Sequence, residues 1–373
     1  YMLAGGDLVK TFVEHCRKIG TTPFVSFRLN DGHHTRGLAE ALKKGKPDQK
    51  MSRFYWENYE RFRIGPDPTD WSQAVFDWAK SEVREHKFAF IEEICRNYDI
   101  AGFELDFMRH WNNFDMDNTT SEQRRDIMVS FVARVRHLLD ETARRGERRW
   151  LCVRIPAFIE AHDRQGIDVV AFAKAGVDMM NLSSSYFTNQ HHDLEEIHRL
   201  APDVPLYLEM THTSMTGRAL GGSGTQPYCR TVDEQFYTTA HLARQQGATG
   251  VSLFNFAYYR YHRSEQLGPF NEPPFHVLPR LKQPEWLARQ PQWYFLTASR
   301  NKPPLSNRPL PVVLEQGKRR TFSMVLAPVD VHRFGGMLRV RAEKPNEGQC
   351  AACLLYTSPS PRDSTLDLEC RLQ

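Results

Sequence analysis

The chain has 373 residues, of which 40% are hydrophobic and 25% charged, a composition typical of one large or two ordinary globular domains. Its 49 Lys and Arg residues nearly balance 45 Asp and Glu residues, and the net charge is +4. This balance, with no Lys/Arg block and no long apolar run, excludes an evident nucleic-acid or membrane partner. The seven cysteines show no metal-like spacing before residue 340.

Strands and helices alternate along the first 290 residues. Hydrophobic periodicity and capping residues predict the elements of the first half, with Ser121 as the expected N-cap of the last of them. In chain order they are a helix over 8–19, a strand over 22–31, a polar and aromatic loop over 32–70, a weak strand over 74–79, a helix over 82–98, a strand over 101–109 and a helix from 121 to about 145.

The same alternation continues in the second half. The expected elements are a strand over 150–158, a helix over 168–175, a strand over 177–186, a helix over 194–200, a strand over 205–213, a Gly-rich loop over 217–224, a helix over 232–246 and a strand over 249–260. Seven apolar strands with helical connections favour an α/β fold, a (β/α)8 TIM barrel over residues 1–290. We expect strand 1 to be missing at a truncated N-terminus, because the chain opens on a helix without an initiator Met. The seven strands are therefore counted as strands 2 to 8.

A doubly wound open sheet is the alternative fold. It would place a Gly-rich phosphate turn after its first strand, and the sequence has none. The Gly-rich loop over 217–224 lacks the lysine of a phosphate-binding loop.

The character of the chain changes after residue 290. Pro-rich linkers separate short alternating runs, including 320–328 and 335–343, and predict a partial β-sandwich-like domain over 291–352. Residues 353–364 resemble translated sequencing adapter, so we expect 353–373 to be a disordered, non-native tail. Because the N-terminus is expected to be missing, the cellular location stays open, and a secreted or periplasmic location is compatible with the sequence.

Two carboxylates share one face of the strand over 101–109. Glu104 and Asp106 point the same way because strand side chains alternate, and burying them is costly unless they are paired. In a TIM barrel, chemistry occurs at the carboxyl ends of the strands, where polar residues gather here. The catalytic candidates are Asp106, Glu209 and Glu104, and the substrate-binding candidates are Arg28, Asn30, Asp31, His33, Arg109, Arg154, Tyr186, His212, Asn255 and Tyr258.

This pattern favours glycoside hydrolysis, which needs two carboxyl groups flanking the scissile bond. Strands 4 and 7 face each other across such a barrel, so Glu104 or Asp106 facing Glu209 could form the pair. Glu104 could instead be structural, paired with Arg28 or Arg154, and Asp106 could bridge to Arg109. Stacking on sugars is expected from some of the loop aromatics Tyr55, Trp56, Tyr59, Trp71 and Trp111.

Two other functions stay open. A non-catalytic carbohydrate-binding barrel would keep the aromatic and Arg residues, and a metal-dependent hydrolase would need His and Asp ligands on several strand ends. We expect no metal or cofactor, because the adjacent His33 and His34 cannot easily face one ion. For His110 and for His212, a place in the site and a place on the surface are weighted equally. The Arg residues at the strand ends hint at an acidic or sulfated sugar as the partner; they are Arg28, Arg109, Arg154 and Arg260. The oligomeric state is open.

A family resemblance supports the carbohydrate hypothesis. The segment NYDIAGFELDFMRH, residues 97–110, resembles the strand-4 signature of bacterial glycosyl-hydrolase-like TIM barrels, the family-10-like group. SFRLND at 26–31 and the helix over 82–94 are similar to that group too, and the resemblance spans about residues 1–290. It implies a carbohydrate-active enzyme with Asp106 at the acidic strand-end position and Glu209 as second acid. The chain departs from that signature at Ala101, where an Asp is usual.

Overall fold

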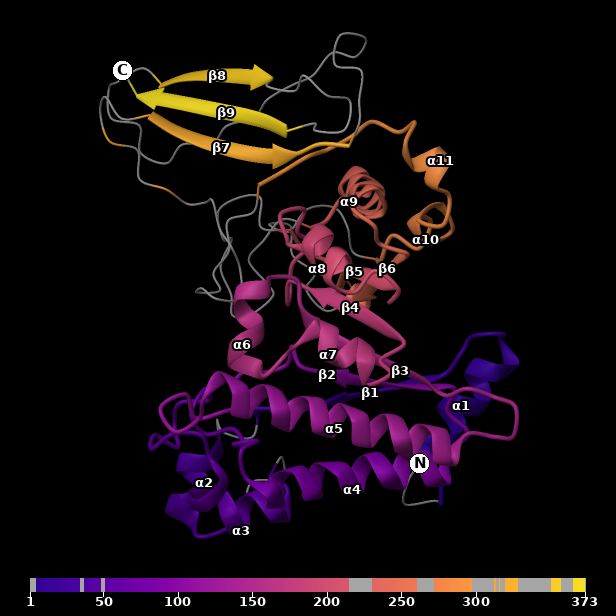
Figure 1. The fold of residues 1–373 in the computed structure, drawn as a ribbon, viewed down its shortest axis with the longest axis vertical. Coiled ribbons are helices and arrows are strands. Elements are labelled where there is room, and N and C mark those ends of the chain that lie inside the picture. The colour runs from indigo at the N-terminus through magenta and orange to yellow at the C-terminus, as the bar shows by residue number, and fades with distance from the viewer. Residues whose placement is uncertain are drawn as a thin grey trace. The chain divides into compact units, whose positions relative to one another are not determined.

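The computed structural model describes residues 5–33, 37–47, 51–214, 230–259, 272–296, 312, 315 and 319–327, and the backbone of 350–356 and 365–372. It divides into two compact units, the first made of residues 1–185 with 196–206 and the second of 186–195 with 207–373 (Figure 1). Within the described part of the chain, no helix has the length and apolar character needed to cross a bilayer.

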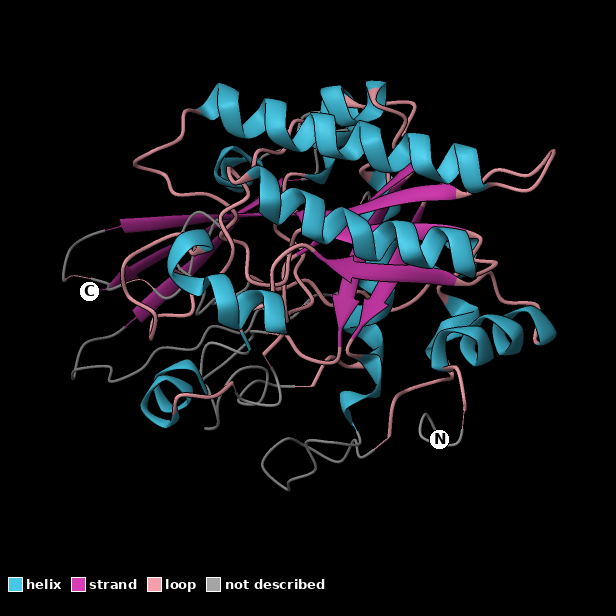
Figure 2. Cartoon of the chain, turned by 90° about the horizontal axis from the view of Figure 1, so that it is seen from below, coloured by secondary structure: helices cyan, strands magenta, loops and turns pink. Residues whose placement is uncertain are grey.

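A parallel sheet forms the centre of the fold. Its six strands stand in chain order, which is the order of a curled half-barrel and of part of a TIM barrel (Figure 2). Direct parallel pairing joins β1 to β2, β2 to β3, β3 to β4, and β5 to β6. The strands are β1 (Phe24–Arg28), β2 (Gly102–Asp106), β3 (Trp150–Pro156), β4 (Met179–Ser183), β5 (Leu206–Thr211) and β6 (Gly250–Phe254).

The helices of the first unit are α1 (Leu8–Lys18), α2 (Leu38–Lys44), α3 (Arg53–Phe62), α4 (Ser81–Asn97), α5 (Ser121–Thr142), α6 (His162–Gln165), α7 (Val169–Lys174) and α8 (Leu194–Leu200). Five of them, α1, α4, α5, α7 and α8, begin and end close to their predicted bounds, and α2, α3 and α6 were not predicted. The N-cap of α5 is Thr120 rather than the predicted Ser121, because Thr120 and Gln123 form a reciprocal capping box. The long helices α4 and α5 lie side by side (Figures 1 and 2).

One face of the sheet is apolar and packs against helices. Phe103 and Leu105 of β2 are fully buried, and the ring of Phe27 in β1 lies 6.2 Å from Phe103 and 6.5 Å from Phe90 of α4. Phe107, just past β2, lies 5.7 Å from Phe172 of α7. Because side chains alternate, Glu104 and Asp106 lie on the face turned away from these helices.

The predicted strand over 74–79 is wrong. Those residues form one isolated bridge, Arg63 to Phe76, and β1 pairs directly with β2. The segment is buried, as its apolar sequence requires, but its backbone bonds go to loops: the N–H of Trp78 donates to the Asn113 carbonyl at 2.8 Å. The predicted strands 2 and 4 are therefore neighbours in the sheet.

The segment over 32–70, expected to be loop, contains α2 and α3. Ser52 caps α3 by accepting the N–H of Tyr55, and one face of α3 is apolar. Tyr55 and Phe62 on that face are buried in a cluster with Leu38 and Phe76. The many polar residues between these positions conceal the helical period in the sequence.

The second unit contains α9 (Asp233–Gln245), α10 (Val277–Arg280) and α11 (Pro284–Leu287), which share a buried cluster with residues of β5. It also contains a three-stranded antiparallel sheet in the order β7-β9-β8, with β7 (Arg319–Val325), β8 (Cys350–Tyr356) and β9 (Thr365–Leu372). The predicted strand over 320–328 corresponds to β7, and that over 335–343 lies outside the described residues. The tail expected to be disordered contributes β9 and most of β8.

Candidate functional site

The polar face of the first four strands carries a row of hydrogen-bonded groups around Glu104. Its Oε1 accepts the Ser26 hydroxyl at 2.6 Å, and its Oε2 accepts Cys152 Sγ at 3.5 Å and Asn181 Nδ2 at 3.4 Å. Burial and then the charge of Glu104 raise the pKa of Cys152 well above its usual value. Within the described residues these partners of Glu104 are uncharged, so the ion pair considered with Arg28 or Arg154 is not formed.

Asp106 lies one step nearer the carboxyl end of β2, between two arginines. The register places it opposite Arg28 on one side and Arg154 on the other. The ion pair is with Arg154, whose Nη1 lies 2.8 Å from Asp106 Oδ1, and both side chains are buried. Asp106 therefore forms its salt bridge with Arg154 of the neighbouring strand β3, and not the one considered with Arg109.

The two oxygens of Asp106 differ in their surroundings. Oδ1 also accepts the backbone N–H of Met108 at 2.8 Å, and Arg154 is steadied by donating to Ser183 Oγ at 3.0 Å. Within the described part of the chain, both hydrogen bonds to this carboxylate end on Oδ1. The Oδ2 atom accepts no hydrogen bond from the described residues.

Asp31, just past β1, organises a second polar cluster. Its Oδ2 accepts Arg28 Nη1 at 2.6 Å, and its Oδ1 accepts the backbone N–H of His33 at 2.9 Å as well as the His33 ring Nδ1. Burial would raise the pKa of Asp31, but these hydrogen bonds outweigh it and hold that pKa well below its usual value. The far nitrogen of the same ring, Nε2, contacts Arg109 Nη2.

His110 completes the wall of this cluster. Its Nδ1 lies 3.6 Å from Asp31 Oδ1, and its ring meets that of His33 edge-on at 5.0 Å. Burial and then the charge of Arg109 lower the pKa of His110 to about 3, so the ring is neutral at ordinary pH. Its φ of 53° is unusual for a residue other than glycine. A Cβ at Gly32 would lie 2.9 Å from the ring, so a side chain at position 32 would force the ring to shift.

Asp31, His33 and His110 could be considered as metal ligands, because their donor atoms lie within 4.8 Å of one another. However, both oxygens of Asp31 already accept hydrogen bonds, and the second nitrogen of His33 faces Arg109. A cation would have to displace these contacts and enter beside two guanidinium groups. The cluster is therefore better suited to an anion than to a metal ion.

Asn30 has a supporting position rather than an open one. Its side chain is 1% exposed, and its amide donates to the carbonyls of Phe76 and Asn112, each at 2.8 Å. It thereby fastens two loops to the end of β1. Its Nδ2 is therefore engaged by the backbone, and substrate binding by Asn30 stays a prediction.

The loop aromatics separate into two groups. Tyr55 is buried with its hydroxyl bonded to the Ala74 carbonyl, and Trp56 and Tyr59 pack against the same cluster. Trp71 is 37% exposed, and its ring meets His110 at 5.1 Å and Trp111 at 5.4 Å. Of the five aromatics, Trp71 and Trp111 are thus the ones that adjoin the polar cluster.

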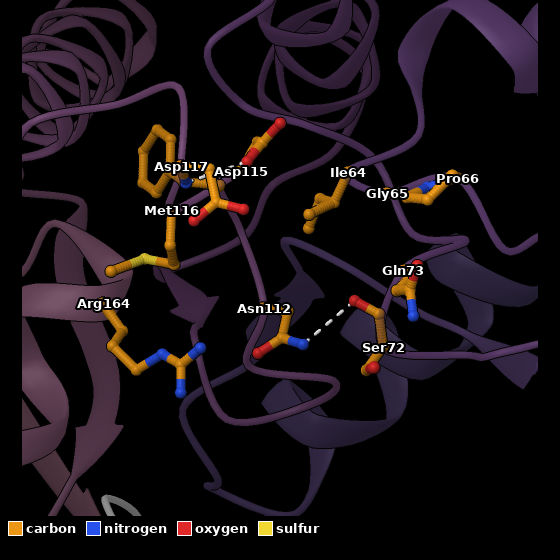
Figure 3. A pocket seen from close by; sticks show the side chains of 11 residues that line it. Ile64, Gly65, Pro66, Ser72, Gln73, Asn112, Asp115, Met116, Asp117 and Arg164 are labelled. Carbon is orange, nitrogen blue, oxygen red and sulfur yellow. Dashed lines mark hydrogen bonds between the residues drawn. The ribbon is translucent and has the colours of Figure 1, made fainter.

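A pocket of about 300 Å³ lies between loops of the first unit (Figure 3). Asn112 in its wall donates to the Ser72 carbonyl at 2.9 Å and accepts from Asn30, so the pocket adjoins the end of β1. Its lining combines apolar Ile64 and Phe114 with charged Asp117 and Arg164. No sequence motif marks it, because the loop positions 64–73 and 112–117 and residue 164 of α6 meet only in the fold.

The second unit contains the candidates Glu209, His212 and Tyr258. Glu209 of β5 is 3% exposed and pairs in register with Ser252 of β6. His212 is fully buried, and its ring lies 5.5 Å from that of Tyr258, so these two candidates are brought together.

Two further candidates lie near the ends of β4 and β6. Asn255 has a φ of 53°, at the end of β6. Tyr186 follows β4, where its carbonyl accepts the hydroxyls of Thr211 and Thr213 and its ring lies 6.0 Å from Phe254. His34, Arg260 and the loop over 217–224 lie outside the described residues.

Comparisons with solved structures return matches among glycoside hydrolases. No protein-family model and no curated protein sequence matches the chain. A chitinase from Rhizomucor miehei is 11% identical, with a TM-score of 0.42 over 73% of this chain and 86% of its own. An α-L-fucosidase from Paenibacillus thiaminolyticus is 13% identical, with a TM-score of 0.41 over 73% and 39%. The galactosidase domain of an α-galactosidase–sucrose kinase is 12% identical, with a TM-score of 0.38 over 99% and 46%.

Proposed function

We propose that the protein is a glycoside hydrolase acting on a poly- or oligosaccharide, with Asp106 and Glu209 as its two catalytic carboxylates. The observation that supports this proposal is the state of Asp106. It is a buried carboxylate at the carboxyl end of a parallel strand, fixed through one oxygen by Arg154 and Met108, and its other oxygen accepts no hydrogen bond from the described residues. A group held in this way is ready to attack a sugar carbon or to take a proton from water.

The surroundings of the carboxylates support a division of roles. Asp106 receives hydrogen bonds from a guanidinium and a backbone N–H, which suits a nucleophile or base rather than a proton donor. Glu209 is then the proposed acid that protonates the leaving oxygen. Glu104, held by three uncharged donors, is a positioning residue that keeps β1, β2, β3 and β4 in register beneath the site.

The test is hydrolysis of a glycan panel by the full chain and by Asp106→Asn and Glu209→Gln. Each substitution should lower kcat by about 10²–10⁴-fold, the usual contribution of a catalytic acid or base. Glu141→Gln, an exposed acid on the outer helix α5, serves as the matched control and should change nothing.

Circular dichroism of each variant separates lost chemistry from lost folding. Folded variants that keep full activity would refute the assignment of the carboxylates. Glycan binding without turnover by the unaltered chain would assign a carbohydrate-binding barrel instead.

A further inference from the structure

Asp31 holds two guanidinium groups at the rim of β1 and β2. It binds Arg28 directly through Oδ2, and it orients His33 through Oδ1. With its Nδ1–H directed at Asp31, the His33 ring offers the lone pair of Nε2 to Arg109. One carboxylate therefore fixes Arg28 directly and Arg109 through an imidazole. We call these four residues the arginine clamp.

The clamp carries more positive than negative charge. Two guanidiniums stand against the single carboxylate of Asp31, while the neighbouring Arg154 and Asp106 neutralise each other. Burial lowers the pKa of His110 most, and the charge of Arg109 lowers it further, whereas the charge of Asp31 raises it by less than Arg109 lowers it. The charges around the ring are therefore net positive. The side chain of Arg28 is 47% exposed, which leaves donors accessible to a ligand.

An aromatic surface lies next to the clamp. His110 touches His33 of the clamp on one side and Trp71 on the other, at ring distances of 5.0 and 5.1 Å. Trp71 is partly exposed and is braced edge-on by Trp111. Guanidinium donors beside an indole suit a ligand with an anionic group on a ring that has an apolar face, and a charged sugar has both.

We propose that the substrate is an acidic saccharide whose anionic group, a uronate carboxylate or a sulfate ester, is bound by Arg28 and Arg109 while its ring packs on Trp71. This proposal rests on the glycoside hydrolase function proposed above and names its substrate class. Asp31 and His33 are positioning residues, because they act on the ligand through the two arginines. Arg28 and Arg109 are far apart in sequence, and the direct pairing of β1 with β2 brings their two segments together.

The experiment measures binding of defined oligosaccharides to the full chain by calorimetry. The acidic arms are oligogalacturonate and a sulfated galactan oligosaccharide, and the neutral arms are cello-, xylo- and chito-oligosaccharides. We expect one acidic arm to bind at least tenfold more tightly than every neutral arm, and the preferred arm identifies the anionic group. Raising NaCl from 50 to 500 mM should weaken that binding by about tenfold, because exposed charge pairs are screened.

The variants Arg28→Gln and Arg109→Gln should each weaken acidic-sugar binding by at least tenfold. His33→Phe should weaken it less, since Arg109 keeps its charge and loses its orientation. Arg96→Gln is the matched control: Arg96 is 46% exposed and pairs with Glu92 and Glu141 on the outer helices. It should leave the affinity unchanged.

The outcomes distinguish this proposal from the proposed function. Hydrolysis of neutral glycans with no preference for acidic ones would overturn the acidic-substrate proposal and leave the glycosidase standing. Tight, salt-sensitive binding of an acidic arm with no turnover would support the clamp and refute the glycosidase. Unchanged affinity in folded Arg28→Gln and Arg109→Gln would overturn the clamp.

Discussion

Replacement of Arg154 by Met tests the buried ion pair that fixes Asp106. The side chains of Arg154 and Asp106 are 5% and 7% exposed, and their contact is 2.8 Å. Removing one member of such a pair strands a buried charge and costs about 3–5 kcal/mol. The lost bond to Ser183 contributes about 1 kcal/mol within that range. Arg154→Met should therefore lower the free energy of unfolding by about 3–5 kcal/mol.

A double-mutant cycle isolates the pair. Asp106→Asn keeps an oxygen for the Met108 N–H but removes the carboxylate charge that lies 2.8 Å from Arg154, so it should cost about 3 kcal/mol. The double variant removes both members of this pair, and its cost should fall short of the sum of the two single costs by at least about 2 kcal/mol.

Equilibrium unfolding in urea at pH 7, followed by circular dichroism, measures each free energy. Arg96→Met, which breaks exposed pairs on α4, is the control and should cost less than about 1 kcal/mol. The reasoning fails if Arg154→Met costs no more than this control, or if the costs of the two single variants simply add.

Three further predictions concern neighbouring residues. Stability should decline below pH 6.5, the unperturbed pKa of histidine, because the unfolded chain gains a proton that His110, with a folded pKa of about 3, does not take up. In urea titrations the free energy of unfolding should fall by about 2 kcal/mol at pH 5 because of this group. The variant His110→Asn, in which Asn tolerates the positive φ, should remove this part of the pH dependence. If the slope of stability against pH is the same in the variant, the lowered pKa of His110 is contradicted. Hydrolytic activity should survive dialysis against EDTA, since Asp31 is engaged by Arg28 and His33, whereas a loss restored by added metal would assign the cluster to a cation. Gly166→Ala should lower the thermal midpoint by several degrees more than Gly146→Ala, because both have positive φ but only at Gly166 would a Cβ meet backbone, 2.3 Å from the Arg124 carbonyl oxygen.

Periodicity predicted most elements of the sheet and its main helices. The strand over 101–109 and the helix over 194–200 have strong local patterns, so β2 and α8 appear where they were expected. The strand prediction over 74–79 was wrong because an apolar run indicates burial but does not specify a hydrogen-bond partner for the backbone. The helix α3 was missed because its apolar face is hidden among polar neighbours, and burial against Leu38 and Phe76 selects it.

The sequence by itself determined that Glu104 and Asp106 share a face, since the two-residue period of a strand is a local property. It also placed Arg28, Asp31, Arg109 and Arg154 at strand ends. Only the tertiary structure decided how these charges pair. Asp106 binds Arg154 of the next strand rather than Arg109 three residues away, and Asp31 connects Arg28 to Arg109 through His33. Such pairing depends on strand register and on distances of a few ångströms between residues remote in sequence, which no local pattern encodes.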